Sequence, residues 1–314
     1  MTRKVLLIDI VHDIIPEKLE SNGYEVISGV QLSRKEILAC INEFCGIVIR
    51  SRIIIDKELI DKAVNLRFVA RVGAGMESID TKYCESKGIS CLNSPEGNRD
   101  AVGEHCIGML LSLMNNLNKA DREVKTGIWL REANRGIELN AKTVGIIGYG
   151  NMGSCFAKKL SGFGCKVISY DKYKTGYEDK YTIETQMSNI FKEADIVSFH
   201  IPLRDETNYL VNDVFISKFN KPIIIINTSR GPIVETEALV RALKTGKIIA
   251  AALDVIEYEE SSFEKTKEMT KFSDFRYLAE SDKVIMSPHI AGWTVESKIK
   301  LAEVLVSKII ALKI

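Results

Sequence analysis

The chain has 314 residues, which is enough for about two domains of the usual size. Its 46% hydrophobic residues allow a sizeable core, while 43 basic and 42 acidic residues leave a net charge of +1. A duplex nucleic-acid-binding protein usually carries a basic excess, and a membrane span needs an apolar run of roughly 20 residues, which the sequence lacks. We therefore expect neither a nucleic-acid partner nor a membrane partner.

Short apolar runs alternate with longer helical patterns along the chain. Near-continuous apolar runs are typical of parallel strands buried on both faces, and their alternation with helices indicates doubly wound sheets. In chain order, the predicted strands cover residues 5–10, 46–50, 68–72, 89–92, 143–148, 166–170, 196–200, 223–227, 249–255 and 284–287. Long helical patterns cover about residues 101–125 and residues 295–314.

The predicted strands fall into two blocks. Residues 1–98 hold four strands, and residues 99–288 hold six strands together with a glycine-rich turn. The last helical pattern follows the final strand of the second block, and we expect it to pack back on the first block. The sequence therefore predicts an α/β protein with two doubly wound parallel-sheet domains, one of residues 1–98 and 289–314 and the other of residues 99–288.

The seven cysteines contain no C-x-x-C pair and no spacing typical of a zinc site. This pattern indicates reduced thiols and predicts no metal site. Near the N-terminus, Asp9, His12 and Asp13 interrupt the first apolar run, which is therefore predicted to be a strand and not a signal peptide. We expect a cytoplasmic protein.

The segment TVGIIGYGNMG has the pattern of a strand, a tight turn and the start of a helix. Gly148 permits the sharp turn, Gly150 lets the backbone approach a pyrophosphate, and Gly153 allows the helix to pack closely on the strand. The N-terminus of the helix presents free amide groups to the phosphates. The turn therefore predicts a dinucleotide-binding site.

An acidic residue ends the next predicted strand. Asp171 lies 18 residues after Gly153, close to the spacing expected of a ribose-binding acid. A carboxylate accepts hydrogen bonds from the ribose 2′-OH and repels a 2′-phosphate, so Asp171 favours NAD over NADP. The neighbouring Lys172 and Lys174 act in the opposite direction.

Oxidation of an alcohol by hydride transfer needs a base for the hydroxyl proton, and the chain has only four histidines. His12 is interpreted as a surface residue and His105 as a packing residue of the long helical pattern. His200 ends a strand and precedes Pro202, where it is expected to line the cofactor crevice. His289 ends the last strand, at the return to the first domain, which is a suitable position for proton transfer.

Arg230 follows the apolar strand IIIINTS and precedes a Gly-Pro turn. At the carboxyl end of a strand its guanidinium is expected to point into the same crevice, and its planar fork suits a carboxylate. A carboxylate that pairs with His289 would hold its tautomer. The candidates for this partner are Asp254, Glu257, Glu259 and Glu260, and composition does not choose among them.

The chain resembles the D-2-hydroxyacid dehydrogenase family in five motifs, which occur in the same order as in the family. These motifs are VGIIGYGNMG, HIPL followed by Thr207, INTSRGPIV, ALDV and SPHIAG. The resemblance covers nearly the whole chain. It implies a Rossmann NAD-binding domain and a flavodoxin-like substrate domain. It also implies that His289 exchanges the substrate proton, that Glu259 is its hydrogen-bonded partner, and that Arg230 binds the substrate carboxylate and carbonyl.

The same resemblance implies the ligand-binding residues. The cofactor residues that it adds to Gly148, Gly150 and Gly153 are Asn151, Met152, Asp171, His200, Pro202, Thr207, Thr228, Ser229, Arg230, Asp254, His289 and Gly292. The substrate carboxylate is expected on the loop Gly73-Ala74-Gly75.

Within the family, the chain is most similar to the 3-phosphoglycerate dehydrogenases. Arg50 and Arg52 flank Ser51 at a strand end, where two arginines can meet a phosphate. The stretch PEGNRDAVGEH, which contains Asn98, resembles the same subgroup. We therefore expect 3-phosphoglycerate as the substrate. The alternatives are glycerate, glyoxylate or D-lactate and, in a different class, a non-catalytic NAD-sensing protein.

Two features depart from the family pattern. Family members usually carry proline soon after the catalytic glutamate, whereas Glu260-Ser261-Ser262 follows here, which leaves the choice among the three glutamates open. The charged segment 260–283 is interpreted as an insertion. From the length of 314 residues we expect none of the regulatory domains of some phosphoglycerate dehydrogenases. A homodimer is expected from the resemblance.

Overall fold

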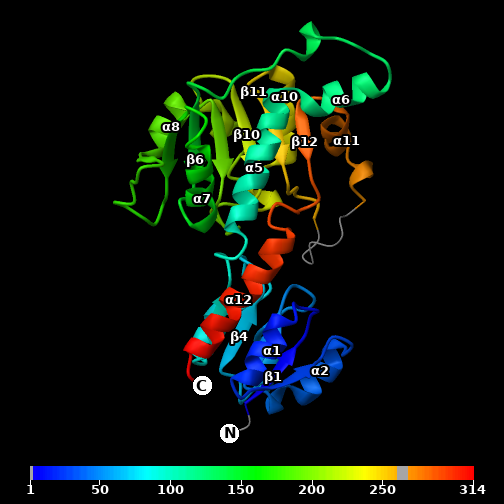
Figure 1. Cartoon of the computed structure of the whole chain (residues 1–314), viewed down its shortest axis with the longest axis vertical. Helices are drawn as coiled ribbons and strands as arrows, with labels where there is room; N and C mark the ends of the chain where they lie inside the picture. Colours follow the sequence, from blue (N-terminus) through cyan, green and yellow to red (C-terminus); the bar gives the residue numbers. More distant parts are fainter. Residues whose placement is uncertain (1–2, 260–267) are drawn as a thin grey trace. The chain divides into compact units, whose positions relative to one another are not determined.

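The computed structural model describes residues 3–259 and 268–314, and these residues form two compact units (Figure 1). The first unit comprises residues 3–99 and 293–314, and the second comprises residues 100–259 and 268–292. The second unit thus extends to residue 292, four residues past the predicted boundary at 288. In the described ranges, no helix combines the length and the apolar character needed to cross a membrane.

The first unit contains a parallel sheet of five strands in the order β2-β1-β3-β4-β5, which is the flavodoxin-like order. Its strands are β1 (Lys4–Leu7), β2 (Glu25–Ser28), β3 (Gly46–Ile49), β4 (Phe68–Arg71) and β5 (Ser90–Asn93). Its helices are α1 (Ile14–Ser21), α2 (Arg34–Cys40), α3 (Lys57–Lys62), α4 (Thr81–Ser86) and α12 (Val295–Ala311), with a 3₁₀ turn η1 (Ile41–Glu43).

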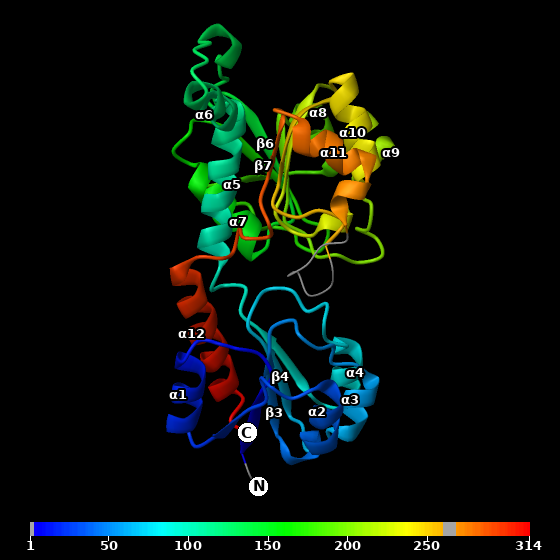
Figure 2. The ribbon, with the colours of Figure 1, turned by 90° about the vertical axis from the view of Figure 1, so that its right-hand side faces the viewer.

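The C-terminal helix α12 covers one face of this sheet. Leu305 and Ile309 are fully buried against Val5, Val48 and Phe68 of the strands. Figure 2 shows α1 and α12 on this face and α2, α3 and α4 on the other. The last residues of the chain therefore complete the core of a unit that is otherwise built from its first 99 residues.

The second unit contains a parallel sheet of seven strands in the order β12-β11-β10-β9-β6-β7-β8. Its strands are β6 (Thr143–Ile147), β7 (Lys166–Tyr170), β8 (Ile183–Glu184), β9 (Ile196–Phe199), β10 (Ile223–Asn227), β11 (Ile248–Leu253) and β12 (Val284–Met286). The strand order reverses between β6 and β9, the point at which doubly wound sheets bind their ligands beyond the carboxyl ends of the strands.

Helices cover both faces of the seven-stranded sheet (Figure 2). One face carries α5 (Arg99–Met114) and α7 (Asn151–Leu160), and the other carries α8 (Met187–Glu193), α9 (Asp213–Ser217), α10 (Thr236–Thr245) and α11 (Ser273–Glu280). The remaining elements are α6 (Leu117–Lys125) and the 3₁₀ turns η2 (Glu132–Asn134), η3 (Gly231–Ile233) and η4 (Met269–Lys271).

The two parallel sheets confirm the predicted fold class. The prediction of one continuous helix over residues 101–125 is wrong, because Asn116 adopts a left-handed conformation with φ of +53° and separates α5 from α6. The edge strands β2 and β8 were missed. Both are short and partly exposed, so they lack the continuous apolar run that marks a central strand.

Candidate active site

Two glycines between the end of β6 and the first turn of α7 have no room for a side chain. Gly148 has φ of +96°, and a Cβ there would lie 2.4 Å from the carbonyl oxygen of His200. A Cβ at Gly153 would lie 2.0 Å from the carbonyl oxygen of Gly148, whereas one at Gly150 would meet no described heavy atom within 4 Å. The first residues of α7 are Asn151 and Met152. Closely packed glycines, an open side at Gly150 and a helix N-terminus together fit the pyrophosphate of a dinucleotide.

Asp171 follows β7 directly and lies beside this turn. Its Oδ2 accepts a hydrogen bond from the amide of Tyr149 at 2.8 Å, and its Oδ1 accepts one from the amide of Tyr173 at 2.9 Å. Tyr149 stands between the first two glycines, so the carboxylate is held next to the phosphate-binding backbone. This position fits a ribose whose hydroxyl groups donate to a carboxylate.

The loop after β9 carries three predicted cofactor residues. Nε2 of His200 lies 2.9 Å from Oγ of Ser198, and its ring packs on Phe156 with centroids 5.6 Å apart. Burial lowers the pKa of His200 to about 4, so the ring is neutral near pH 7. The hydroxyl of Thr207 donates to the carbonyl oxygen of Pro202 at 2.8 Å and closes the loop.

The loop after β10 is held by an amide side chain that we did not single out. Asn227 is fully buried, and its Nδ2 donates to the carbonyl oxygen of Arg230 at 2.9 Å. Its Oδ1 accepts hydrogen bonds from the amide and the hydroxyl of Ser229 at 3.1 and 2.8 Å. The hydroxyl of Thr228 lies 3.3 Å from Sγ of Cys106. Asn227 therefore fixes the backbone that carries Arg230.

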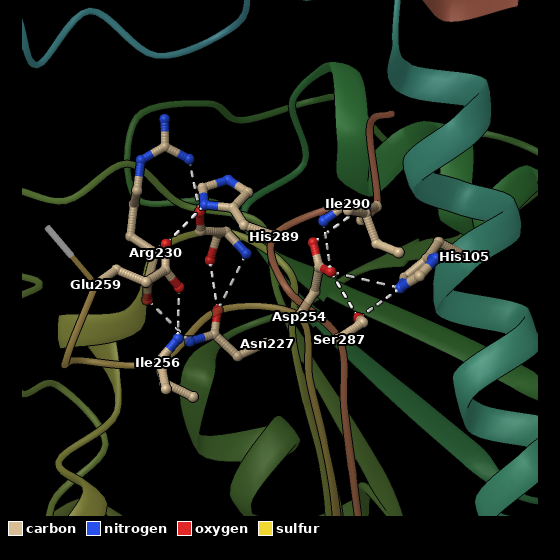
Figure 3. A network of polar contacts seen from close by, with 11 residues as sticks. His105, Asn227, Arg230, Asp254, Ile256, Glu259, Ser287, His289 and Ile290 are labelled. Atoms are coloured by element: carbon tan, nitrogen blue, oxygen red, sulfur yellow. Dashed lines mark hydrogen bonds and ion pairs between the residues drawn. The ribbon is translucent and has the colours of Figure 1, made fainter. Parts of the chain in front are cut away.

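The loops after β10 and β11 pack together at Gly231, where a Cβ would lie 1.9 Å from the carbonyl oxygen of Ile256. The amide of Ile256 donates to Oε1 of Glu259 at 2.7 Å, and Oε2 of Glu259 lies 2.7 Å from Nδ1 of His289. A carboxylate only accepts hydrogen bonds, so Nδ1 is the donor and Nε2 is the acceptor of the neutral ring. Figure 3 shows the side chains of Arg230, Glu259 and His289 gathered together.

The three neighbouring glutamates have different surroundings. Oε2 of Glu257 accepts a hydrogen bond from the amide of Thr236 at 3.0 Å, at the first residue of α10. Glu259 is the one whose carboxylate meets His289. Glu260 lies outside the described residues.

Asp254 is fully buried and organises the loop that carries His289. Its Oδ1 accepts hydrogen bonds from the hydroxyl of Ser287 at 2.6 Å and from the amide of Ile290 at 2.8 Å. Its Oδ2 accepts one from the amide of Ala291 at 2.8 Å, and its carbonyl oxygen accepts one from the amide of His289 at 2.8 Å. His289 has φ of +55°, an unusual value for a side-chain-bearing residue, and these bonds hold it there.

The same network reaches the helix α5. Nε2 of His105 lies 2.9 Å from Oγ of Ser287 and 3.5 Å from Oδ1 of Asp254. Sequence reasoning interpreted His105 as a packing residue and passed over Ser287. Neither position carries a local signal of this role, because the contact joins residues 182 apart in the sequence. Gly292, a predicted cofactor residue, ends the second unit.

The two arginines predicted to bind phosphate, Arg50 and Arg52, have different partners in the first unit. The guanidinium of Arg50 lies 4.6 Å from the centre of the exposed ring of Trp293. Every guanidinium nitrogen of Arg52 donates to the backbone, and the accepting carbonyls are those of Ile8, Gly29 and Leu32. Arg52 therefore holds the loops after β1 and β2 together, whereas Arg50 lies against an aromatic ring.

The side chain of Arg71, a residue predicted only to contribute backbone to the carboxylate-binding stretch 71–75, holds this loop in place. Arg71 ends β4 and is buried, with Nη1 donating to the carbonyl oxygen of Gly75 at 2.7 Å and Nε donating to that of Arg50 at 2.9 Å. Nδ2 of Asn93 donates to the carbonyl oxygen of Ala74 at 2.6 Å. A polar residue at the end of an apolar strand was the available signal for Arg71 and Asn93, as it was for Asn227.

The remaining predicted substrate residues lie in the same unit. Gly73 has φ of +155°, Ser51 follows β3, and Asn98 directly precedes α5. Oδ1 of Asn98 is buried and has no hydrogen-bond partner among residues 3–259 and 268–314. In those ranges no three His, Cys, Asp or Glu side chains are placed to hold a metal ion.

A family model described as "D-isomer specific 2-hydroxyacid dehydrogenase, NAD binding domain" matches residues 107–291. The chain is 34% identical to the hydroxypyruvate reductase of Thermotoga maritima over 90% of this chain and 89% of that protein. It is 32% identical to the D-3-phosphoglycerate dehydrogenase of Archaeoglobus fulgidus over 98% of this chain and 56% of that protein.

Among solved structures, the fold matches the D-lactate dehydrogenase of Aquifex aeolicus in complex with NAD and lactic acid. The TM-score is 0.82 at 28% identity, over 99% of this chain and 95% of the other. These matches confirm the resemblance predicted from the five sequence motifs. The chain belongs to the D-isomer specific 2-hydroxyacid dehydrogenase family and is an NAD-dependent enzyme of that family.

Proposed function

We propose that His289 exchanges the proton of the substrate hydroxyl while Arg230 binds the substrate carboxylate. The observation that carries this proposal is the 2.7 Å contact between Glu259 and Nδ1 of His289, which leaves Nε2 as the proton acceptor. The carboxylate of Glu259 stabilises the ring once it is protonated. NAD, held by the glycine turn and Asp171, would supply the acceptor for the hydride from C2 of the substrate. The guanidinium of Arg230 holds the carboxylate and polarises the developing carbonyl.

The substrate of this reaction is 3-phosphoglycerate, which is oxidised to 3-phosphohydroxypyruvate at the start of serine biosynthesis. The amides of the loop Gly73-Ala74-Gly75 bind its carboxylate, with Asn98 nearby, and Arg50 and Ser51 meet its phosphate. Support comes from Arg50, whose side chain lies against Trp293, and from the similarity to a D-3-phosphoglycerate dehydrogenase along 98% of this chain. All seven cysteines lie outside disulfides, which supports a cytoplasmic location.

A second candidate is the reduction of hydroxypyruvate or glyoxylate to the corresponding hydroxy acid. One specific observation favours it: Arg52 is engaged with backbone carbonyls, so it offers no second fork to a phosphate.

The experiment is a substrate profile followed by NADH absorbance. For oxidation, 3-phosphoglycerate, D-glycerate and D-lactate are compared at alkaline pH. The reaction releases a proton, and the low proton concentration shifts the equilibrium towards oxidation. For reduction, 3-phosphohydroxypyruvate and hydroxypyruvate are compared at neutral pH. The proposal expects 3-phosphoglycerate to have a higher kcat/KM than D-glycerate and D-lactate, and 3-phosphohydroxypyruvate to have a higher kcat/KM than hydroxypyruvate. A higher value for hydroxypyruvate assigns the chain to the second candidate.

The active form of the enzyme is a homodimer. This part of the proposal is supported by a run of exposed apolar side chains in and after α6, in residues 117–137. These side chains are Leu117, Val124, Ile128, Trp129, Leu130 and Ile137. Clustered exposed apolar residues are typical of a protein interface. The double variant Trp129→Ser/Leu130→Ser should lower the mass measured by light scattering from dimer to monomer, while Val214→Ser on α9 should not. A monomeric wild-type chain rejects the homodimer.

A further inference from the structure

The two residues that follow Asp171 are both bound by one carboxylate from the loop after β9. Glu206 forms an ion pair with Nζ of Lys172 and accepts a hydrogen bond from the hydroxyl of Tyr173. Arg204, from the same loop, donates to the hydroxyl of Tyr173 at 3.0 Å and stacks on its ring at 5.1 Å. The loops after β7 and β9, the two strands that flank β6, are thus joined at the ribose side of the cofactor site.

Lys172 stands where a dinucleotide-binding enzyme can discriminate against or accept a 2′-phosphate. A carboxylate at the position of Asp171 binds the 2′-hydroxyl, while a cation beside it accommodates the 2′-phosphate of NADP. The sequence Asp171-Lys172-Tyr173-Lys174 offers both kinds of group. Nζ of Lys174 donates to the carbonyl oxygen of Tyr149 at 3.0 Å, which ties it to the glycine turn. The net charge beside the ribose therefore depends on whether Lys172 is paired with a carboxylate, which here is Glu206.

We propose that Glu206 is a second determinant of the preference for NAD, because it neutralises Lys172 and keeps it away from a 2′-phosphate. The pairing raises the pKa of Lys172 and lowers the pKa of Glu206, since each charge stabilises the other. Both groups are therefore charged near pH 7, and the pair presents no net positive charge. In this arrangement Asp171 repels the phosphate directly, and Glu206 removes the group that would attract it.

The same strand supplies a matched control. Lys166 begins β7 and pairs with Glu193 at 2.5 Å, at the opposite end of the strand from Asp171. The side-chain exposures of this pair, 47% and 38%, are close to the 55% and 38% of Lys172 and Glu206. Replacing Glu193 therefore removes an equivalent surface ion pair without changing the charge beside the ribose.

The experiment measures the Kd of NADH and of NADPH by fluorescence titration of the full chain, without substrate and in low salt. The Glu206→Gln variant should lower the ratio of the NADPH Kd to the NADH Kd about fivefold, the scale of one exposed ion pair. The Glu193→Gln variant should leave the ratio unchanged. The inhibition constants of 2′,5′-ADP and 5′-AMP, measured by competition, should give a ratio that changes in the same way. These two ligands differ in the 2′-phosphate and lack the nicotinamide half of the cofactor.

Two further measurements separate charge from a local rearrangement. Adding Lys172→Met to Glu206→Gln should return the ratio to the wild-type value, because the attracting cation is gone. The effect should also shrink in about 1 M salt, where the Debye length is about 3 Å. An unchanged ratio in Glu206→Gln, an equal change in Glu193→Gln, or a gain that persists without Lys172 would overturn the proposal. The catalytic proposal is independent of all these outcomes, because each measurement reports cofactor binding in the absence of substrate.

Discussion

Oε2 of Glu259 and Nδ1 of His289 lie 2.7 Å apart, although 30 residues separate them in the sequence. The second oxygen of Glu259 is held by the amide of Ile256, so the carboxylate has one defined orientation. This geometry fixes which nitrogen of the ring carries hydrogen, and it is the basis of the first two predictions.

The His289→Ala variant should retain cofactor binding and lose turnover. Without a positioned proton acceptor, kcat should fall by about 10² to 10⁴. Steady-state kinetics and the Kd of NADH, measured on the same preparation, check this. The His12→Ala variant is a suitable control, because His12 lies in the other unit and its Nδ1 accepts a hydrogen bond from the amide of Ile14. Near-normal kcat in His289→Ala would reject the role of His289.

Glu259→Gln and Glu257→Gln should behave differently. Loss of the charge that stabilises protonated His289 should reduce kcat about tenfold to a hundredfold, as expected for a charge-assisted hydrogen bond. Glu257 binds the amide of Thr236 at the start of α10, so its variant should lose about 0.5 kcal/mol of unfolding free energy and little activity. Kinetics and urea unfolding of both variants test the distinction. A larger loss of kcat in Glu257→Gln would transfer the partner role to Glu257.

Asp254→Asn should destabilise the second unit as well as slow the reaction. Both carboxylate oxygens of Asp254 accept hydrogen bonds, and an amide nitrogen at either position would face a backbone N–H. One buried unsatisfied contact should lower the unfolding free energy by about 2–3 kcal/mol. Urea unfolding measures this loss. An unchanged stability would show that the network around Ser287 and Ile290 does not depend on the charge.

Arg50→Ala and Arg52→Ala separate substrate binding from structure. Arg50→Ala should raise the KM for 3-phosphoglycerate about tenfold or more while changing that for D-glycerate by much less, because a charge-assisted contact to phosphate is lost. Arg52→Ala should lower the unfolding free energy by about 1–3 kcal/mol, since Arg52 donates to three backbone carbonyls. Equal effects of Arg50→Ala on the two substrates would reject the phosphate contact.

His200 should make the protein less stable in mild acid. Burial lowers its pKa to about 4, whereas an unfolded histidine takes up a proton near pH 6.5. The unfolded chain therefore binds more protons between these values, and stability falls as the pH drops from about 6.5 to about 4, by up to about 3 kcal/mol. His200→Gln should weaken this dependence in urea unfolding at several pH values. An identical pH dependence in the variant would contradict the assignment.

The central strands, the glycine turn and the position of Asp171 could be predicted from the sequence alone. These features depend on local rules: continuous apolar runs mark buried parallel strands, and Gly148, Gly153 and Asp171 stand at spacings that one strand-turn-helix-strand unit imposes. The edge strands β2 and β8 and the break at Asn116 escaped prediction, because partial exposure and a single left-handed residue leave no periodic signal.

The partners of the charged side chains, in contrast, could be identified only once the folded chain was known. Glu257 and Glu259 are two residues apart, yet one binds the start of α10 and the other meets His289. Arg50 and Arg52 are equally close in the sequence, yet one lies on Trp293 and the other is bound by backbone carbonyls. A side chain's partner depends on which distant loop packs beside it, and spacing along one segment does not contain that information.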